Sequence, residues 1–419
     1  MSDERYNPAL HWLAILTAVC TFPLIWMGGL VTSHGAGLAV PDWPNSYGYN
    51  MWLFPPSQWV GGIFLEHVHR LLGTLVGFCA TLLMLNAWGF GEKLVTRKKL
   101  RAAAVLGLAI AGMCVLVVPN LASSIQGQPS ARGLLIQMAV LLVGLSMVLS
   151  AASVMKKREP RRWVRWLATS VLLSVIFQGV LGGLRVVWVN LDLAIVHACI
   201  AQAFFCLAAL ACVVTGRWWL ETAREPGAPG GKGLIIAASI AVVIIYLQLV
   251  AGAVMRHYGA GLAIIDIPLN YGKVLPPITE AELGAVNTLR TYRLNMPAVT
   301  LSQVWLHFAH RIGAIAVTAA LVLLIIKTVR MRNPALNRPA RAIIFLLITQ
   351  LTLGVLTVIL RKPADMASAH VAVGALTLLT TFVLMVRALR LYSPNLIGKP
   401  DFRRADVDAT MTPARPLAA

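Results

Sequence analysis

Apolar runs long enough to cross a lipid bilayer recur along the whole chain, and they restrict what it can fold into. A membrane-spanning helix needs about 20 consecutive apolar residues. Of the 419 residues, 58% are hydrophobic and only 12% are charged, whereas a soluble domain carries about 25% charged residues. The sequence therefore predicts an all-α polytopic membrane protein of about ten spans, at residues 11–33, 60–89, 101–119, 131–153, 163–187, 191–215, 233–255, 301–327, 342–361 and 366–389.

The positive charge of the chain lies mainly in short connections between these spans. The 36 Lys and Arg residues outnumber the 16 Asp and Glu residues, for a net charge of +20. Basic residues cluster in 91–101, 156–165 and 327–341, whereas 34–60 contains none. By the positive-inside rule both termini are cytoplasmic and the loops 34–59 and 256–300 face outward. The charge sets orientation in a membrane, so we expect the lipid bilayer and no nucleic acid as a partner.

The cysteines and the two ends of the chain narrow the class further. All six cysteines lie inside apolar spans and none forms a CxxC pair, which predicts free thiols. The polar N-terminus, 1–9, precedes a span without a small-residue cleavage site, so we expect a multi-pass protein of the bacterial inner (cytoplasmic) membrane. The polar, proline-containing tail 394–419 is typical of a disordered cytoplasmic segment.

Two outer loops open with nearly the same sequence. The first begins Gly-Ala-Gly-Leu-Ala at Gly35 and the second repeats these five residues at Gly259, and each continues with a matched Asp and Pro. In the helices that follow, His69-Arg70 lies 241 positions before His310-Arg311. The matching loops and helices indicate an internal duplication.

A third match completes the repeat. The pattern Gln-x-x-Leu-Gly-x-Leu-x-Val occurs at 178–186 and 350–358, and each copy precedes a histidine at the start of the next span, His197 and His370. The chain therefore reads as two four-span units in the same orientation, 10–215 and 233–390. The interval from His69 to His197 exceeds that from His310 to His370, which indicates a helical hairpin, 101–153, inserted in the first unit and packed outside it.

The repeat selects four histidines as candidate metal ligands, His69, His197, His310 and His370. Ionisable side chains at membrane depth are costly and usually functional. Two imidazoles from facing helices of a four-helix unit suit the axial ligation of a haem iron. Interfacial histidines that bond only to water or backbone are the alternative, but recurrence of the pair in both copies favours ligation. Zinc is a weaker rival, because no Cys or carboxylate cluster completes a tetrahedral site.

The two copies differ at one position beside a ligand. Glu66 in the first copy corresponds to His307 in the second, and residues i and i+3 share a helix face. Glu66 is therefore a candidate catalytic carboxylate beside His69. Its alternative role is to orient an imidazole or to pair with Arg70. Arg70 and Arg311 are candidate cofactor-binding residues that pair with haem propionates, or else form plain salt bridges, and His67 is expected to pack or to contact a loop.

These motifs together resemble the haem A synthases, over about 10–90 and 163–390. The resemblance implies an oxidoreductase that oxidises the C8 methyl group of haem O to a formyl group by successive hydroxylations, and so supplies haem A for the assembly of terminal oxidases. It further implies that His69 and His197 flank the substrate haem, that Glu66 is catalytic and that His310 and His370 ligate a haem b.

The resemblance also sets expectations for partners, and the chain departs from the family in one loop. Haem O, haem O synthase, an electron donor of unknown identity and a second copy of the chain are the expected partners. Many bacterial members have a cysteine pair in the first outer loop, but Val40 stands at the usual first cysteine here. A disulfide in that loop therefore cannot operate in this chain.

Two other functions use the same features. A di-haem membrane cytochrome that only passes electrons would use the four histidines equally well, but gives no reason for a carboxylate beside one haem alone. A transporter would also be duplicated, but no span has a clear Pro/Gly interruption at its middle and the polar residues gather at one end.

Overall fold

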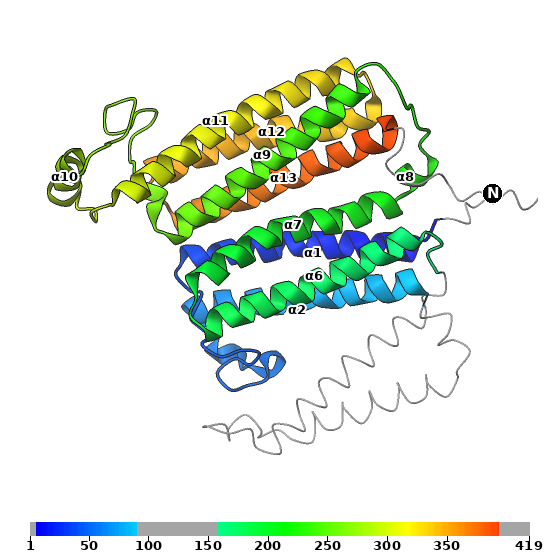
Figure 1. Ribbon diagram of the computed structural model, residues 1–419. Helices are drawn as coiled ribbons and strands as arrows, with labels where there is room; N and C mark the ends of the chain where they lie inside the picture. Colours follow the sequence, from blue (N-terminus) through cyan, green and yellow to red (C-terminus); the bar gives the residue numbers. More distant parts are fainter. Residues whose placement is uncertain (1–5, 90–157, 394–419) are drawn as a thin grey trace, which may run out of the picture.

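The computed structural model describes residues 6–89 and 158–393, which are helical apart from loops and two isolated β-bridges. Within these ranges eight helices have the length and apolar composition to cross a membrane (Figure 1). They are α1 (Pro8–Ser33), α2 (Gly61–Trp88), α6 (Arg162–Val187), α7 (Leu191–Thr215), α9 (Gly231–His257), α11 (Leu301–Arg330), α12 (Pro334–Ile359) and α13 (Ala364–Tyr392). The polytopic all-α class is thereby confirmed.

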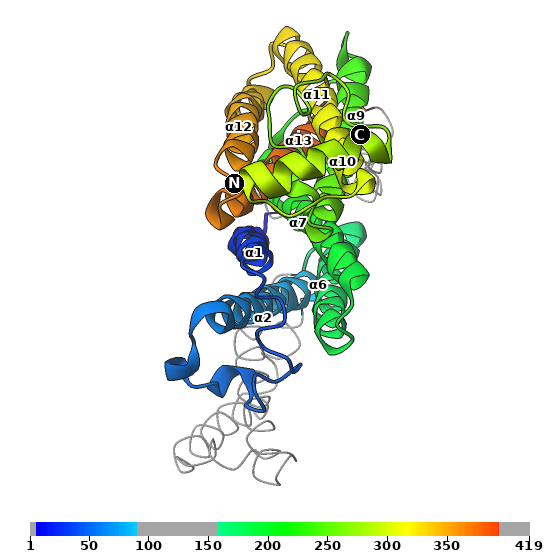
Figure 2. The ribbon, with the colours of Figure 1, turned by 90° about the vertical axis from the view of Figure 1, so that its left-hand side faces the viewer.

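The eight helices form two groups of four. In the first, α1 and α6 each pack against both α2 and α7; in the second, α9 and α12 each pack against both α11 and α13. The groups meet where α1 and α7 lie against α13, with α7 also touching α9, and the end-on view shows them stacked (Figure 2). The connections 34–60 and 258–300 lie at the same end, here called the loop end.

The structure corrects the expected bounds at one connection. The stretch 327–341 was predicted as a basic loop, but α11 continues to Arg330 and α12 already begins at Pro334. Pro334 is at the first turn, where proline needs no hydrogen-bond partner, and the Asn333 side chain accepts from the Ala335 amide. The basic residues therefore lie on helix ends. The expected hairpin 101–153 and tail 394–419 lie outside the described residues.

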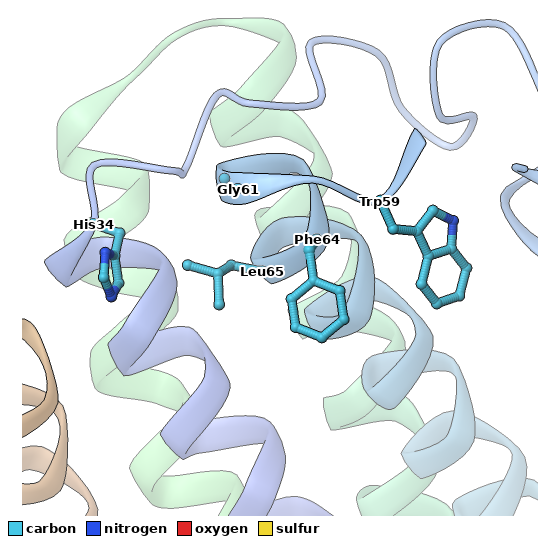
Figure 3. Close-up of a pocket in the computed structure, with 6 residues that line it drawn as sticks. His34, Trp59, Gly61, Phe64 and Leu65 are labelled. Carbon is cyan, nitrogen blue, oxygen red and sulfur yellow. The ribbon is translucent and has the colours of Figure 1, made fainter. Parts of the chain in front are cut away.

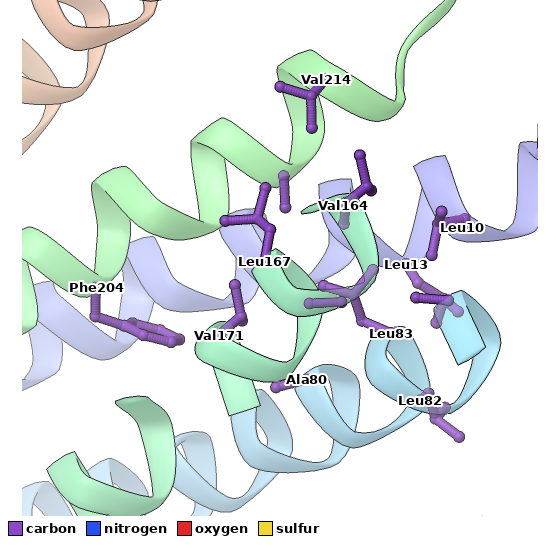
Figure 4. Packing of buried hydrophobic residues seen from close by; sticks show 14 of the residues in the cluster. Leu10, Leu13, Ala80, Leu82, Leu83, Val164, Leu167, Val171, Phe204 and Val214 are labelled. Atoms are coloured by element: carbon purple, nitrogen blue, oxygen red, sulfur yellow. The ribbon is translucent and has the colours of Figure 1, made fainter. Parts of the chain in front are cut away.

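The apolar cores fill the end of each group away from the loop end. In the first group Leu10, Leu83, Val164 and Val214 are 0–2% exposed and meet between α1, α2, α6 and α7 (Figure 4). In the second group Leu234, Leu324, Ile343 and Leu384 are fully buried in the same relative place. The close packing that holds each bundle together thus lies at one end, and the loop end is free to house a cavity.

The two outer loops share one fold around an aspartate. The carboxylate of Asp42 accepts from the amides of Tyr47 and Gly48 at 2.7 and 2.8 Å. Asp266 accepts from the amides of Tyr271 and Gly272 at 2.8 and 2.9 Å. Each aspartate thereby closes the turn that follows it, and the matched sequence produces a matched loop.

A tyrosine in each loop ties the turn back to the loop opening. The Tyr47 hydroxyl donates to the Ala39 carbonyl, and the Tyr271 hydroxyl donates to that of Ala263. Tyr271 also accepts from the buried Arg290 guanidinium at 2.9 Å. Burial raises the pKa of the Tyr271 hydroxyl above its ordinary value, so this phenol remains protonated and keeps its donor role at neutral pH.

Replacing Asp266 by Ala should loosen the second loop locally. The half-buried amide of Tyr271 and the exposed amide of Gly272 would lose their acceptor, and a hydrogen bond of this kind contributes about 0.5–1.5 kcal/mol. Hydrogen exchange measured by mass spectrometry should show faster exchange over residues 266–273, with the helices unchanged. Glu280→Ala, at an exposed position in the same loop without a side-chain hydrogen bond in the described structure, is the control; equal protection in both variants would contradict the aspartate's role.

Candidate functional site: paired histidines in a loop-end cavity

The four histidines selected by the repeat line one cavity. This cavity has a volume of about 800 Å³ and lies at the loop-end half of the bundle, and its wall includes His69, His197, His310 and His370. They come from α2, α7, α11 and α13, so each group of helices contributes two. The volume is in the range of sites for cofactors and drug-sized ligands.

The first pair has the spacing that one metal ion between two imidazoles requires. The ring centroids of His69 and His197 are 6.4 Å apart. Metal–imidazole bonds of about 2.0 Å on either side of one ion place the ring centroids about 6 Å apart. Within the described residues no group of three or more His, Cys, Asp or Glu side chains could hold a metal ion. The ligand set is therefore a pair, which fits axial haem ligation better than a tetrahedral zinc site.

Each histidine ring lies against a glycine of a neighbouring helix. A Cβ added at Gly28 would be 3.4 Å from the His69 ring, and one at Gly182 would be 3.1 Å from that of His197. In the second group a Cβ at Gly252 or Gly354 would be 3.0 or 3.1 Å from His310 or His370. Gly28 and Gly252 are 224 positions apart, as are the two loop openings. The four positions are matched in the repeat, and glycine there lets the imidazoles occupy their places.

Three of the four histidines accept hydrogen bonds from glutamine side chains of neighbouring helices. Gln178 donates to the His197 carbonyl at 3.1 Å, and Gln350 donates to a ring nitrogen of His370 at 3.3 Å. Gln248 donates to both the carbonyl and a ring nitrogen of His310, at 2.8 and 3.1 Å.

Three of the four imidazoles nevertheless retain a buried nitrogen without a partner. These atoms are Nδ1 of His69, His197 and His370. An unsatisfied buried polar atom costs about 1–3 kcal/mol. Such atoms are expected where the native partner is a metal centre, so the residues present fit a haem iron.

Glu66 anchors the first loop. Its side chain is buried, accepts from the Val40 amide at 2.9 Å and forms an ion pair with Arg70 at 3.0 Å. Arg70 in turn donates to the carbonyls of Val40, Asp42 and Asn45 at 2.6–2.7 Å. The pairing of Glu66 with Arg70, one of the two roles expected, is thus observed, and Glu66 also lines the cavity.

His307 occupies the same place in the second loop. The Nδ1 atom of its ring accepts from the Ile264 amide at 3.1 Å, and its Nε2 atom lies 3.4 Å from Nε of Arg311. Arg311 donates to the Ile264 and Leu269 carbonyls at 3.2 and 3.0 Å. A carboxylate and an imidazole therefore accept the equivalent loop amide, and only the first half has a negative charge at this point.

The arginines expected to bind haem propionates have these loop groups as their hydrogen-bond partners. Pairing of Arg70 or Arg311 with a propionate stays a prediction, and both do line the cavity. Most of their donors, however, are engaged by loop oxygens and by Glu66 or His307. Their observed role is to hold the loops against α2 and α11.

Two other cations at the cavity wall were missed by the sequence reasoning. The first is Arg185, near the end of α6, whose Nη1 atom is 2.8 Å from where a Cβ at Gly37 would lie. The second is Lys362, just after α12, whose Cδ atom is 3.4 Å from where a Cβ at Gly261 would lie. The two glycines are equivalent in the matched loop openings. Among the described residues neither cation has a hydrogen bond or ion pair. An arginine at the end of an apolar span was the available signal for Arg185.

A polar contact joins the two halves beside the histidines. Arg256 of α9 donates to the Gly29 carbonyl and to the Ser33 hydroxyl of α1. Ser33 also bonds to the Ser368 hydroxyl of α13 at 2.9 Å. Ser368 is two residues before His370, and Gly29 follows the glycine against which His69 lies. The two histidine pairs are therefore held in a common framework.

The remaining histidines near the loop end have other surroundings. His67 packs against the rings of Phe54 and Trp59 and bonds to Ser46 at 3.2 Å, which confirms its expected loop-contact role. His34 lines a second cavity of about 450 Å³ between the ends of α1 and α2 (Figure 3). Its other lining residues are glycines, aromatics and a leucine. This second cavity has one histidine and no facing partner for it.

Comparison with known proteins identifies the family. Residues 137–383, more than half of the chain, match the COX15-CtaA family, described as cytochrome oxidase assembly proteins. The chain belongs to this family. The matched range includes His197, His310 and His370 and excludes Glu66 and His69. Membership and the eight membrane-length helices make the chain a multi-pass membrane protein.

Curated relatives are named haem A synthases. That of Rickettsia prowazekii (strain Madrid E) is 27% identical over 150 residues, 36% of this chain and 42% of the relative. That of Rickettsia bellii (strain OSU 85-389) is 29% identical over 136 residues, 32% of this chain and 37% of the relative. The chain thus spans about two-fifths of the length of these relatives, whose bacterial origin indicates the inner membrane.

Replacing Gly354 by Val should displace His370. The valine side chain would overlap the imidazole, for which a Cβ alone is already at 3.1 Å, so haem held by the second pair should be lost. The measurement is the haem absorbance per protein of the purified variant. Gly77→Val is the matched control, because a Cβ at Gly77 meets no atom within 4 Å; unchanged absorbance of Gly354→Val would remove His370 from the set of ligands.

Proposed function

We propose that this member of the COX15-CtaA family is a haem A synthase, which oxidises the C8 methyl group of haem O to a formyl group. The observation that carries the proposal is the duplicated histidine pair with unpartnered ring nitrogens, of which only the first has a carboxylate, Glu66, in the cavity wall. The relatives' names support the same function.

The four histidines divide between two roles in this proposal. His69 and His197 hold the iron of the substrate haem; the glycine contacts of both rings and the hydrogen bond from Gln178 to the His197 carbonyl keep the two residues in place. His310 and His370 hold a haem b, which supplies one-electron redox chemistry when bound. The link from Arg256 through Ser33 to Ser368 keeps the two pairs in fixed positions relative to each other.

The propionates of each haem are assigned to the cations without partners. Arg185 serves the first half and Lys362 the second, because both line the cavity at equivalent loop glycines. Arg185 is partly buried, and a carboxylate partner stabilises a buried cation, whereas Lys362 is exposed. Arg70 and Arg311, whose donors hold the loops, shape the walls and contribute positive potential.

Glu66 is the base that accepts the protons released during oxidation of the C8 methyl group. Each of its oxygens already accepts one hydrogen bond, from Val40 or Arg70, but a carboxylate has acceptor sites for about four. Its carboxylate therefore has remaining acceptor capacity in a cavity that it lines. Arg70 and the Val40 amide stabilise the charged form and hold it in one orientation.

The overall change requires a carboxylate or an equivalent base. Two successive hydroxylations give a hydroxymethyl group and then a hydrate, and loss of water from the hydrate leaves the formyl group. With the added oxygen counted at the oxidation level of water, conversion of the methyl group and one water to the formyl group releases four electrons and four protons, two of the protons from the methyl carbon and two from the water. The electrons pass to a one-electron acceptor and the protons to a base, for which Glu66 is positioned in the first half alone.

The second candidate is a di-haem cytochrome that only passes electrons. The duplicated histidine pairs favour it equally, whereas the carboxylate confined to the first half does not. Extraction of pigment from the purified protein, followed by mass analysis, decides between them. Haem O and haem A with haem b support the synthase, and haem b alone supports the cytochrome. Absence of any haem would overturn both.

Glu66→His and Glu66→Gln should separate the two roles of Glu66. His307 shows that an imidazole at this position can accept the loop amide and lie beside the arginine, so Glu66→His should keep the loop and the haem but stop haem A formation. Glu66→Gln keeps the shape and removes the charge. The measurement is chromatography of haems extracted from cells that make haem O together with each variant.

The outcomes distinguish chemistry from anchoring. Haem O or a hydroxymethyl intermediate that accumulates in both variants supports a catalytic carboxylate. Wild-type haem A in either variant would sink that role. Haem-free protein from Glu66→Gln, with haem restored in Glu66→His, would show that Glu66 serves only to hold the loop and its arginine.

A further inference from the structure

The two halves differ in how much space adjoins their histidine pairs. Gly73 and Gly179 in the first half correspond to Ala314 and Leu351 in the second, at the repeat spacings of 241 and 172 positions. All four residues line the cavity. The second half therefore has side chains at two wall positions where the first half has none.

The glycines of the first half border open space. A Cβ added at Gly73 or Gly179 would meet no atom within 4 Å. The glycines found only in the second half behave differently: a Cβ at Gly313 would overlap Gln248 at 2.0 Å, and one at Gly374 would be 2.9 Å from Leu249. The glycines at 313 and 374 thus make room for side chains of neighbouring residues, whereas the space beside Gly73 and Gly179 contains no atom of the described residues.

The opening leads from the histidines towards the lipid. Gly73 is one turn further along α2 than His69, and Gly179 is nearly one turn before Gly182, against which His197 lies. Both positions are thus deeper in the membrane than the histidines. The two helices pack against each other, and Gly179 is exposed together with Ile176 and Phe177 on the same side of the bundle.

We infer that the first half selects a haem with a long apolar chain, which leaves the cavity between α2 and α6 over Gly73 and Gly179 into the lipid. Ala314 and Leu351 close this path in the second half, which takes a haem without the chain. The inference rests on the proposed function, because haem O differs from haem b by such a hydroxylated isoprenoid chain.

The test transfers the second-half residues into the first half of the full-length chain. Gly179→Leu combined with Gly73→Ala should lower the content of haem O plus haem A per protein by about tenfold or more. The added side chains would overlap the apolar chain, and overlap of this kind weakens binding at least as much as overpacking destabilises a protein core. Haem b per protein should stay at the wild-type level. The measurement is chromatography of haems extracted from the purified protein, made in cells that produce haem O.

Gly77→Leu is the matched control, because Gly77 lies on α2 beside equally open space but does not line the cavity. It should keep both haem contents. The reciprocal variant, Leu351→Gly with Ala314→Gly, should let haem O enter the second half and so raise the content of haem O.

The outcomes also separate this inference from the proposed function. A wild-type protein without haem O or haem A would overturn the function itself. A wild-type protein that holds them, with equal contents in the double variant, would overturn only the chain path. If the double variant lost haem b as well, Gly179→Ala decides: loss of haem O alone supports the path, and parallel loss or retention of both haems contradicts it.

Discussion

A partly buried arginine in each half binds the outer loop to the helix behind it, and the site at the loop end depends on this contact. Arg70 and Arg311 each donate to carbonyls at equivalent loop positions. Carbonyls that are turned from water towards a helix must find partners in the protein. One guanidinium with several donors in a fixed geometry meets this need. The loop is thereby placed over the cavity, next to the histidine one position earlier in the helix.

The acceptor beside each arginine shows how duplication can be followed by divergence. Glu66 and His307 accept the equivalent amide and contact the equivalent arginine. Because the imidazole performs the anchoring task in the second half, a carboxylate is not needed for anchoring alone. The fold therefore does not require the negative charge of Glu66 in the first half. For this reason we assign the chemistry to that half.

The loop also accounts for the position at which this chain departs from the cysteine-containing members it resembles. Val40 is fully buried, its amide donates to Glu66 and its carbonyl accepts from Arg70. The five cysteines among the described residues are free thiols, as expected from their places in apolar spans. Backbone contacts and aspartate-closed turns therefore stabilise a loop that has no disulfide.

The sequence by itself determined the membrane class, the duplication and the four histidines. The length of the apolar runs and the charge of the loops decide how a chain inserts in a bilayer, and repeated motifs can be recognised in the sequence without knowledge of the packing. It also predicted that Glu66 could pair with Arg70, since residues four apart share a helix face. It did not predict that loop carbonyls accept hydrogen bonds from Arg70, or that Arg185 and Lys362 line the cavity. Nor did it predict which glycines contact a histidine ring and which border open space. Those features depend on which helices pack together and how closely, and close approach between segments that are not neighbours in the sequence is decided only by the tertiary structure.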